Sequence, residues 1–183
     1  MDRDLFKDSR LRFRVRKPSA WSFMPSAWSP VATLKRAEDF RDTLIQKAKL
    51  PFCCAMGHHE SPRHAYPTMQ ISARQALPYT DELGDTFLKS TVHGLKSLHP
   101  TFELMYATLG GTFAGYKSVS LCGTLKLLIF PEDEEIEIAV LSRSYTIFAP
   151  QATFTIVLSG SADPEYFDEG DFNAILQSIK VDA

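Results

Sequence analysis

The sequence is poor in cysteine and has no long hydrophobic run, and each absence excludes a class of protein. Its 183 residues include three cysteines, Cys53, Cys54 and Cys122. An odd number with an adjacent pair makes a poor disulfide framework, because a bridge between neighbours strains the peptide that joins them. No apolar stretch approaches the roughly 20 residues of a membrane-spanning helix, and the first residues lack the apolar core of a secretory signal. We therefore expect reduced thiols, no membrane insertion and a cytoplasmic location.

Motifs of nucleotide-binding and hydrolytic enzymes are also missing. The glycine-rich Leu109–Thr112 lacks both the Walker lysine and the spacing of a dinucleotide-binding loop. Ser159–Ser161 lacks the leading glycine of a nucleophile turn. The acidic groups at 132–137 and 163–171 lack the spacing of an EF-hand calcium loop and fit solvated charge better. We therefore expect a protein that is not an enzyme, with no catalytic residues and no cofactor.

The composition is that of an ordinary globular protein. Hydrophobic residues make up 44% and charged residues 23%. A chain of this length suits one domain, and it can bury about 70% of the surface that its unfolded form exposes, so it needs no disulfide or metal to fold. We predict a single α+β domain over residues 1–183.

Hydrophobic periodicity predicts three helical regions. The clearest is Thr80–Leu98, which begins with a capping threonine and acidic residues, carries an apolar stripe and ends before a proline. A second helix is predicted over residues 33–48. A third is predicted to open at Asp163–Glu165, where a cap, a proline and an acidic residue follow one another. It is predicted to break at Gly170, and Asp171 is predicted to cap a second piece through Ile175, Leu176 and Ile179.

Short β-rich segments predict an antiparallel sheet. They are residues 11–16, 52–56, 67–77, 102–109, 113–121, 124–130, 136–142 and 153–159. Gly110-Gly111, Gly123 and Pro131–Glu135 are predicted turns between the later segments. Short connections favour antiparallel pairing, because a parallel crossover needs a dozen or more residues. The predicted architecture is a single antiparallel β-sheet with helices packed on its faces.

The most distinctive stretch is the strand predicted at 10–16, where Arg10, Arg12, Arg14 and Arg16 alternate with apolar residues. Four guanidinium groups on one face would attract anions, and Trp21 and Trp28 would supply stacking surfaces for a single-stranded nucleic acid. The alternative is pairing with carboxylates elsewhere. Residues 1–49 hold 12 basic and 6 acidic side chains, a balance of +6, and the rest hold 8 and 16, a balance of −8. The pairing interpretation is favoured, so a nucleic-acid partner is not expected.

Cysteine and histidine gather between residues 53 and 64. Cys54, His58, His59 and His64 are the residues that zinc would require. Cys53 and Cys54 would point to opposite faces of a strand, and no second ligand pair completes a tetrahedral site. A Cys/His enzyme or a metal-dependent enzyme centred on 53–64 is therefore the alternative function, and the favoured interpretation is a buried strand cysteine beside a polar loop.

Three stretches resemble the PsbP-like group of folds, which includes the DcrB family and the Mog-type Ran-binding import factors. They are Leu11–Pro18 followed by Trp21, then Tyr66–Ile71, then Thr153–Ser159 with Pro164–Phe167 and Phe172–Ile179. The resemblance implies an α/β/α sandwich and binding rather than catalysis. Members act as photosystem assembly subunits, small-GTPase partners or chaperones of type VI secretion effectors, and they share no catalytic residues. The Trp21–Leu50 segment is longer than a minimal member needs.

The leading prediction is thus a non-enzymatic protein-binding module, such as an adaptor, chaperone or assembly factor. Aromatic and arginine side chains dominate interface energetics. The predicted partner-binding residues are therefore Trp21, Phe23, Met24, Trp28, Arg12 and Arg14. Core packing is the alternative for the tryptophans. An anion or nucleic-acid binder acting through residues 10–16 is the third function considered.

Overall fold

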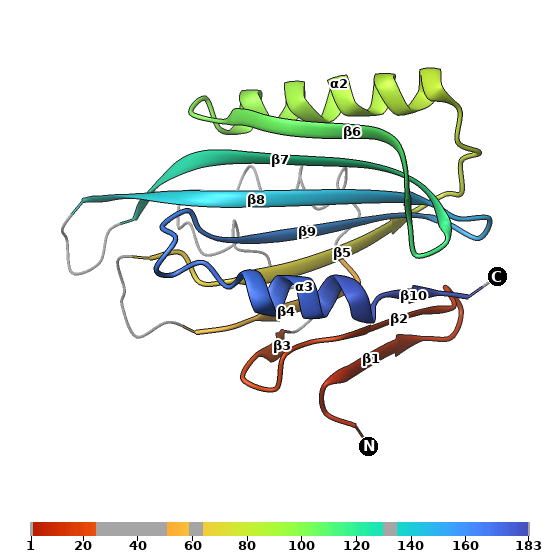
Figure 1. The fold of residues 1–183 in the computed structure, drawn as a ribbon, viewed down its shortest axis with the longest axis horizontal. Coiled ribbons are helices and arrows are strands. Elements are labelled where there is room, and N and C mark those ends of the chain that lie inside the picture. The colour runs from red at the N-terminus through yellow and green to blue at the C-terminus, as the bar shows by residue number, and fades with distance from the viewer. Residues whose placement is uncertain (1, 25–50, 59–63, 130–134, 183) are drawn as a thin grey trace, which may run out of the picture.

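The computed structural model describes residues 2–24, 51–58, 64–129 and 135–182. Within these residues the strands form one sheet of seven and one of three (Figure 1). The large sheet contains, in spatial order, β3 (Ser22–Met24), β4 (Cys53–Met56), β5 (Thr68–Arg74), β9 (Thr153–Ser161), β8 (Ile136–Phe148), β7 (Tyr116–Ile129) and β6 (Glu103–Phe113). The small sheet contains β1 (Leu5–Asp8), β2 (Phe13–Arg16) and β10 (Lys180–Val181).

Every strand pair in the two sheets is antiparallel. This confirms the predicted α+β class. The structure adds the three-stranded sheet to the single sheet that the sequence predicts. Strand β10 has two residues and pairs with β2 from the other end of the chain, so no local pattern could reveal it.

Two helices lie on opposite faces of the large sheet. Helix α2 (Asp81–Leu98) is capped by Thr80, whose hydroxyl accepts a hydrogen bond from the Leu83 amide at 3.1 Å. It lies along β6 and β7 (Figure 1). Helix α3 (Glu169–Ser178) buries Phe172 and Ile175 against the other face. Neither helix in the described ranges is long and apolar enough to cross a membrane.

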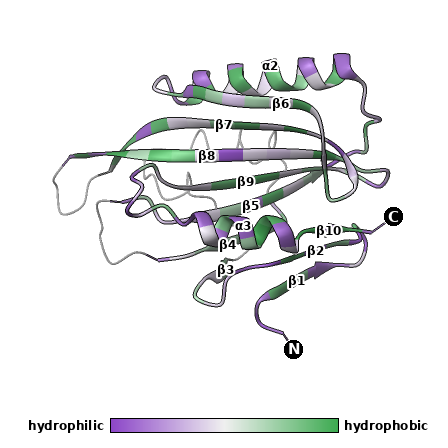
Figure 2. Ribbon diagram, viewed as in Figure 1, coloured by the Kyte–Doolittle hydropathy of each residue, from purple (hydrophilic) through white to green (hydrophobic). Residues whose placement is uncertain are grey.

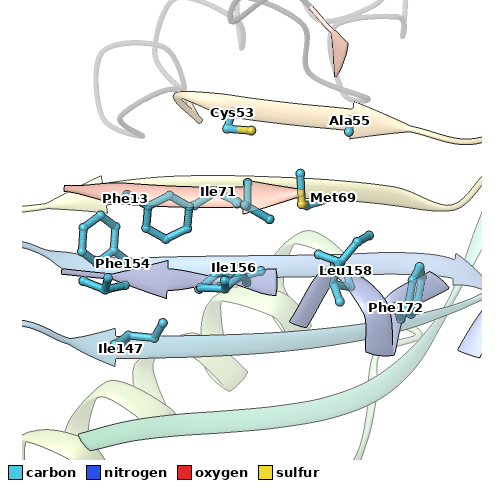
Figure 3. Close-up of a cluster of buried hydrophobic side chains, with 14 of the residues drawn as sticks. Phe13, Cys53, Ala55, Met69, Ile71, Ile147, Phe154, Ile156, Leu158 and Phe172 are labelled. Carbon is cyan, nitrogen blue, oxygen red and sulfur yellow. The ribbon is translucent and has the colours of Figure 1, made fainter. Parts of the chain in front are cut away.

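The main core lies between the large sheet, α3 and the small sheet. Alternate residues of β5 and β9 point into it, including Met69, Ile71, Phe154, Ile156 and Leu158, all fully buried (Figure 3). Phe13 of β2 joins them from the small sheet, with its ring 5.0 Å from that of Phe154. A second, smaller cluster between α2 and β6–β8 contains Phe102, Leu121, Leu125, Ile138 and Val140.

Gly123 does not form the predicted turn, and the segments predicted as 113–121 and 124–130 are one continuous strand, β7. A Cβ at Gly123 would lie 2.5 Å from the Phe102 ring and 2.6 Å from the Glu103 carbonyl oxygen. Glycine is therefore required here by close packing rather than by a turn.

The β6–β7 turn also lies later than predicted. Gly110 and Gly111 belong to β6, and the hairpin turns at Ala114-Gly115, where φ is +50° and +87°. Positive φ at both central residues is typical of a two-residue hairpin turn.

Helix α3 corresponds to the second predicted piece, but it begins at Glu169 rather than after Asp171, so Gly170 lies in its first turn. The first piece, predicted to open at Asp163, is not helical. Asp163–Glu165 forms a turn, in which the Asp163 carboxylate accepts from the Glu165 amide at 3.0 Å. A local side-chain hydrogen bond of this kind competes with helix formation. The helix predicted at 33–48 lies outside the described residues.

Candidate protein-binding edge

Strand β6 is an outer strand of the large sheet. It pairs with β7 on one side, and no other strand of the described ranges pairs with it. Its eleven residues carry one charge, on Glu103. Unpaired backbone groups along such an edge are a template for a further strand, and most proteins blunt them with charges, proline or short strands.

Exposed hydrophobic side chains gather on and around this edge. Met105 and Tyr106 of β6 are 59% and 52% exposed, and Leu104 and Leu109 are also exposed. Strand β6 thus holds four of the eight exposed large hydrophobic residues among those described. Grouped apolar exposure marks an interaction surface, whereas single exposed residues need no explanation.

Helix α2 covers only part of the sheet beside β6. Its Leu88, Val92 and Leu95 pack against the small cluster, yet Gly84 is the one fully buried residue that it contributes. Figure 2 shows hydrophilic and hydrophobic segments alternating along α2, and β6 drawn mostly in pale and green colours beside it. The apolar face of β6 is therefore only partly shielded by its neighbouring helix.

Two irregularities interrupt the edge. The β6–β7 register shifts between Leu104 and Tyr106 and again between Thr108 and Gly111. Bulges of this kind bend and twist a strand. Lys117 of β7 donates to the Gly110 carbonyl at 3.2 Å in the second bulge. These devices limit uniform stacking of many copies, while leaving the apolar side chains accessible.

A hollow of about 410 Å³ lies at the Glu103 end of β6, lined by Thr101, Glu103, Thr124, Leu125, Lys126, Ala139 and Ala162. The Thr101 hydroxyl accepts from the Lys126 amide at 3.0 Å and so holds the chain before β6 against β7. The hollow therefore extends inward from the start of β6, over β7 and β8, as far as Ala162.

An ion pair that holds α3 lies on the sheet face opposite α2. Tyr106, Cys122 and Arg143 are neighbours in register across β6, β7 and β8, so their side chains share a face. Burial and then the Cys122 thiol raise the pKa of Tyr106. Arg143 donates to both carboxylate oxygens of Glu169, at 2.9 and 2.7 Å, and its hydrogen bonds lower the pKa of Glu169.

The predicted partner-binding aromatics lie at the opposite side of the sheet. Trp21 is 4% exposed, and its indole nitrogen donates to the Asp171 carboxylate at 2.8 Å. Phe23 and Met24 are half-buried on β3, where the Phe23 ring lies 6.1 Å from that of Phe6. Trp28 lies outside the described residues. Core packing is the arrangement observed for Trp21.

The four arginines do not form the predicted stripe on one strand face. Only Arg14 and Arg16 belong to β2, because Arg12 has a φ of +50° that ends the strand's extended geometry. Arg10 contacts Asp8 at 3.5 Å, Arg14 contacts Asp182 at 3.4 Å and Arg16 contacts Asp2 at 2.6 Å. The arginines are thus paired with carboxylates, but of these three pairs only Arg14–Asp182 uses the acidic C-terminal part of the chain, and the other two use the N-terminal segment itself.

Among the described residues, the cysteines are buried, and His58 and His64 each contact a different tyrosine. Burial raises the pKa of Cys53 to about 12 and that of Cys54 to about 11, so both thiols stay protonated at neutral pH. His64 stacks on Tyr166 at 3.6 Å, and His58 packs edge-on to Tyr66. His59 lies outside the described ranges, within which no three metal-binding side chains form a group.

The sequence contained a signal for the β6 edge. Residues 104–109 combine β propensity with a near absence of charge. Such a run predicts a buried central strand as readily as an exposed edge. Only the strand order, which depends on long-range pairing, distinguishes the two.

The sequence matches no protein-family model, and no curated protein matches it. Among solved structures, LpqN of Mycobacterium tuberculosis, described as involved in cell envelope biogenesis, has 16% sequence identity and a TM-score of 0.51. The match covers 93% of this chain and 83% of LpqN. It shows a similar fold.

Two further structures match with lower scores. The cyanobacterial PsbP (CyanoP) of Synechocystis has a TM-score of 0.49 and 16% identity, over 100% of this chain and 95% of CyanoP. A Bacteroides thetaiotaomicron protein has a TM-score of 0.46 and 9% identity, over 100% of this chain and 50% of that protein. The DcrB and Mog-type parts of the resemblance stay predictions.

Proposed function

We propose that this protein is a non-enzymatic protein-binding module that binds an extended segment of a partner protein along β6. In this arrangement the segment adds a strand to the large sheet, with backbone hydrogen bonds giving affinity and side-chain contacts giving specificity. The observation that carries the proposal is a long, apolar and exposed edge strand whose outer side pairs with no other strand of the described residues. An adaptor, chaperone or assembly factor would use such an edge.

The other outer strand, β3, fits this role less well. It has three residues, against eleven in β6. Phe23, at its centre, packs against Phe6 and lies 5.5 Å from the Lys17 ammonium group, so it is engaged within the protein. We therefore place the main binding surface at β6 and not at the residues around Trp21.

The state of the three cysteines supports a location in a reducing, cytoplasmic compartment. Cys53, Cys54 and Cys122 are buried and form no disulfide with one another. Protonated, buried thiols at positions 53 and 54 are poor nucleophiles and poor metal ligands. The observed chemistry of these side chains thus favours packing over catalysis.

The test is Leu109→Lys in the full chain. A lysine on an edge strand opposes strand addition, so we expect this variant to lose proteins that the immobilised wild-type chain retains from an extract of its native cells. Leu77→Lys is the matched control, because Leu77 is 42% exposed, like Leu109 at 44%, and lies outside β6. Both variants should keep wild-type stability within about 0.5 kcal/mol.

Two results would contradict the proposal. One is retention of the same proteins by wild type and Leu109→Lys. The other is self-association of the wild type, seen by light scattering and abolished by Leu109→Lys, which would make a second copy the occupant of the edge.

A further inference from the structure

The solvent face of the three-stranded sheet juxtaposes like charges. Arg14 on β2 lies directly opposite Lys7 of β1 and, on its other side, opposite Lys180 of β10. Phe13 and Val15 point to the core, so Arg14 and these two lysines share the outer face. Like charges directly opposite each other on a sheet are destabilising.

A hollow of about 350 Å³ lies at this cluster. It is lined by Lys7, Ser9, Arg12, Phe13, Arg14 and Asp182. Three cationic side chains, those of Lys7, Arg12 and Arg14, and the Asp182 carboxylate are among the residues that line it. Its volume is in the range of small-molecule sites.

The one carboxylate at the hollow neutralises Arg14 weakly. Asp182 contacts Arg14 through a single 3.4 Å approach, and both side chains are largely exposed, so the pair contributes little. The Arg14 Nε is buried and has no hydrogen-bond partner among the described residues. A buried polar atom without a partner costs free energy, so the hydrogen-bonding capacity of Arg14 is not fully satisfied by the described residues.

The walls of the hollow are held in place by the fold. Gln151 donates to the Leu11 carbonyl at 3.3 Å and to the Asp182 carbonyl at 2.9 Å. The Asp182 amide donates to the Arg12 carbonyl at 3.0 Å. The segments before β2 and after β10 are therefore tied together, and the cations are positioned before any ligand arrives.

We propose that this hollow binds a small phosphorylated molecule through Lys7 and Arg14. A phosphate carries up to two negative charges at neutral pH, so it interacts with the opposed cations of Lys7 and Arg14 more strongly than a carboxylate does. The arginine fork suits phosphate oxygens, and Ser9 offers a neutral hydroxyl donor. Single-stranded nucleic acid fits less well, because Trp21 is buried and supplies no stacking surface.

The first measurement is calorimetric titration of the full chain with inorganic phosphate and with glucose 6-phosphate, at constant ionic strength. We expect one site, with binding weakened at least about tenfold in Lys7→Gln and in Arg14→Gln, because each removes a charged hydrogen bond. Tighter binding of glucose 6-phosphate would assign an organic phosphomonoester, and equal binding would assign free phosphate. Lys89→Gln removes the same charge from α2, far from the hollow, and should bind like the wild type.

A stability measurement separates binding from folding. Without phosphate, Lys7→Gln should melt at or above the wild-type temperature, because it relieves repulsion with Arg14. Absence of phosphate binding to the wild type would overturn the proposal, as would equal loss in Lys89→Gln or equal affinity for acetate. Binding of a single-stranded oligonucleotide that Lys7→Gln does not weaken would also overturn it.

Discussion

Arg143 on β8 and Glu169 at the start of α3 are joined by two parallel hydrogen bonds of 2.9 and 2.7 Å. The guanidinium group also lies 5.0 Å from the Phe167 ring, just before the helix. This one side chain therefore fixes the beginning of α3 against the sheet, on the face that continues to Tyr106 and the β6 edge.

The ion pair should make stability depend on pH. The pKa of Glu169 is lowered in the folded state, so its contribution is present at neutral pH and is lost as the pH falls through that lowered value. Glu169→Gln should cost about 1 kcal/mol at pH 7, since Glu169 is 49% exposed and solvent screens the pair. Melting curves between pH 7 and pH 2 should show this gap closing, with Glu165→Gln as an exposed acidic control. A gap that is constant with pH would contradict the assignment.

Gly123 should tolerate no side chain. Gly123→Ala places a Cβ within 2.6 Å of the Glu103 carbonyl and of the Phe102 ring, and we expect a loss of about 2 kcal/mol or more in chemical unfolding. The matched change Gly94→Ala, in α2 with no atom within 4 Å of the added Cβ, should stabilise the protein by roughly 0.5–1 kcal/mol. Equal effects of the two substitutions would show that Gly123 is not a packing contact.

Trp21 should behave as a core residue. Trp21→Ala removes a buried indole and its hydrogen bond to Asp171, so we expect a loss of about 3–5 kcal/mol in unfolding free energy. Leu128→Ala, at an exposed position of β7, should change stability by less than about 0.5 kcal/mol. If Trp21→Ala unfolds like the wild type, the indole is not part of the core and the binding role predicted for it regains support.

Cys53 and Cys54 should resist a thiol reagent in the folded protein. Their pKa values of about 12 and 11 leave almost no thiolate at pH 8. Mass spectrometry after labelling should find both unmodified in buffer and both modified in denaturant. Rapid labelling of Cys54 without denaturant would reopen the Cys/His alternative.

Features that depend on residues close together in the sequence were predicted most accurately. The α2 helix was predicted within one residue of its observed start because its cap and acidic first turn are local features, and Thr80 does cap it. The antiparallel class followed from short connections. The alternation of arginine with apolar residues correctly placed Phe13 and Val15 in the core.

Features that depend on distant contacts could not be predicted. The sequence predicts a turn at Gly123, because the packing of Phe102 against it cannot be predicted from the neighbouring residues. Phe23 and Met24 were predicted to lie in a loop, but they pair with β4 and belong to the large sheet. The exposure of Leu104–Leu109 depends on β6 being the outermost strand, which only the order of the whole sheet determines.

The binding role of β6 is tested most directly by hydrogen exchange of its backbone amides, with and without a partner retained by the wild-type chain and not by Leu109→Lys. Strand addition predicts that amides of residues 103–113 exchange more slowly in the complex, while those of β3 are unchanged. Protection confined to β3 or to the small sheet, with β6 exchanging as in the free protein, would contradict the proposed binding edge.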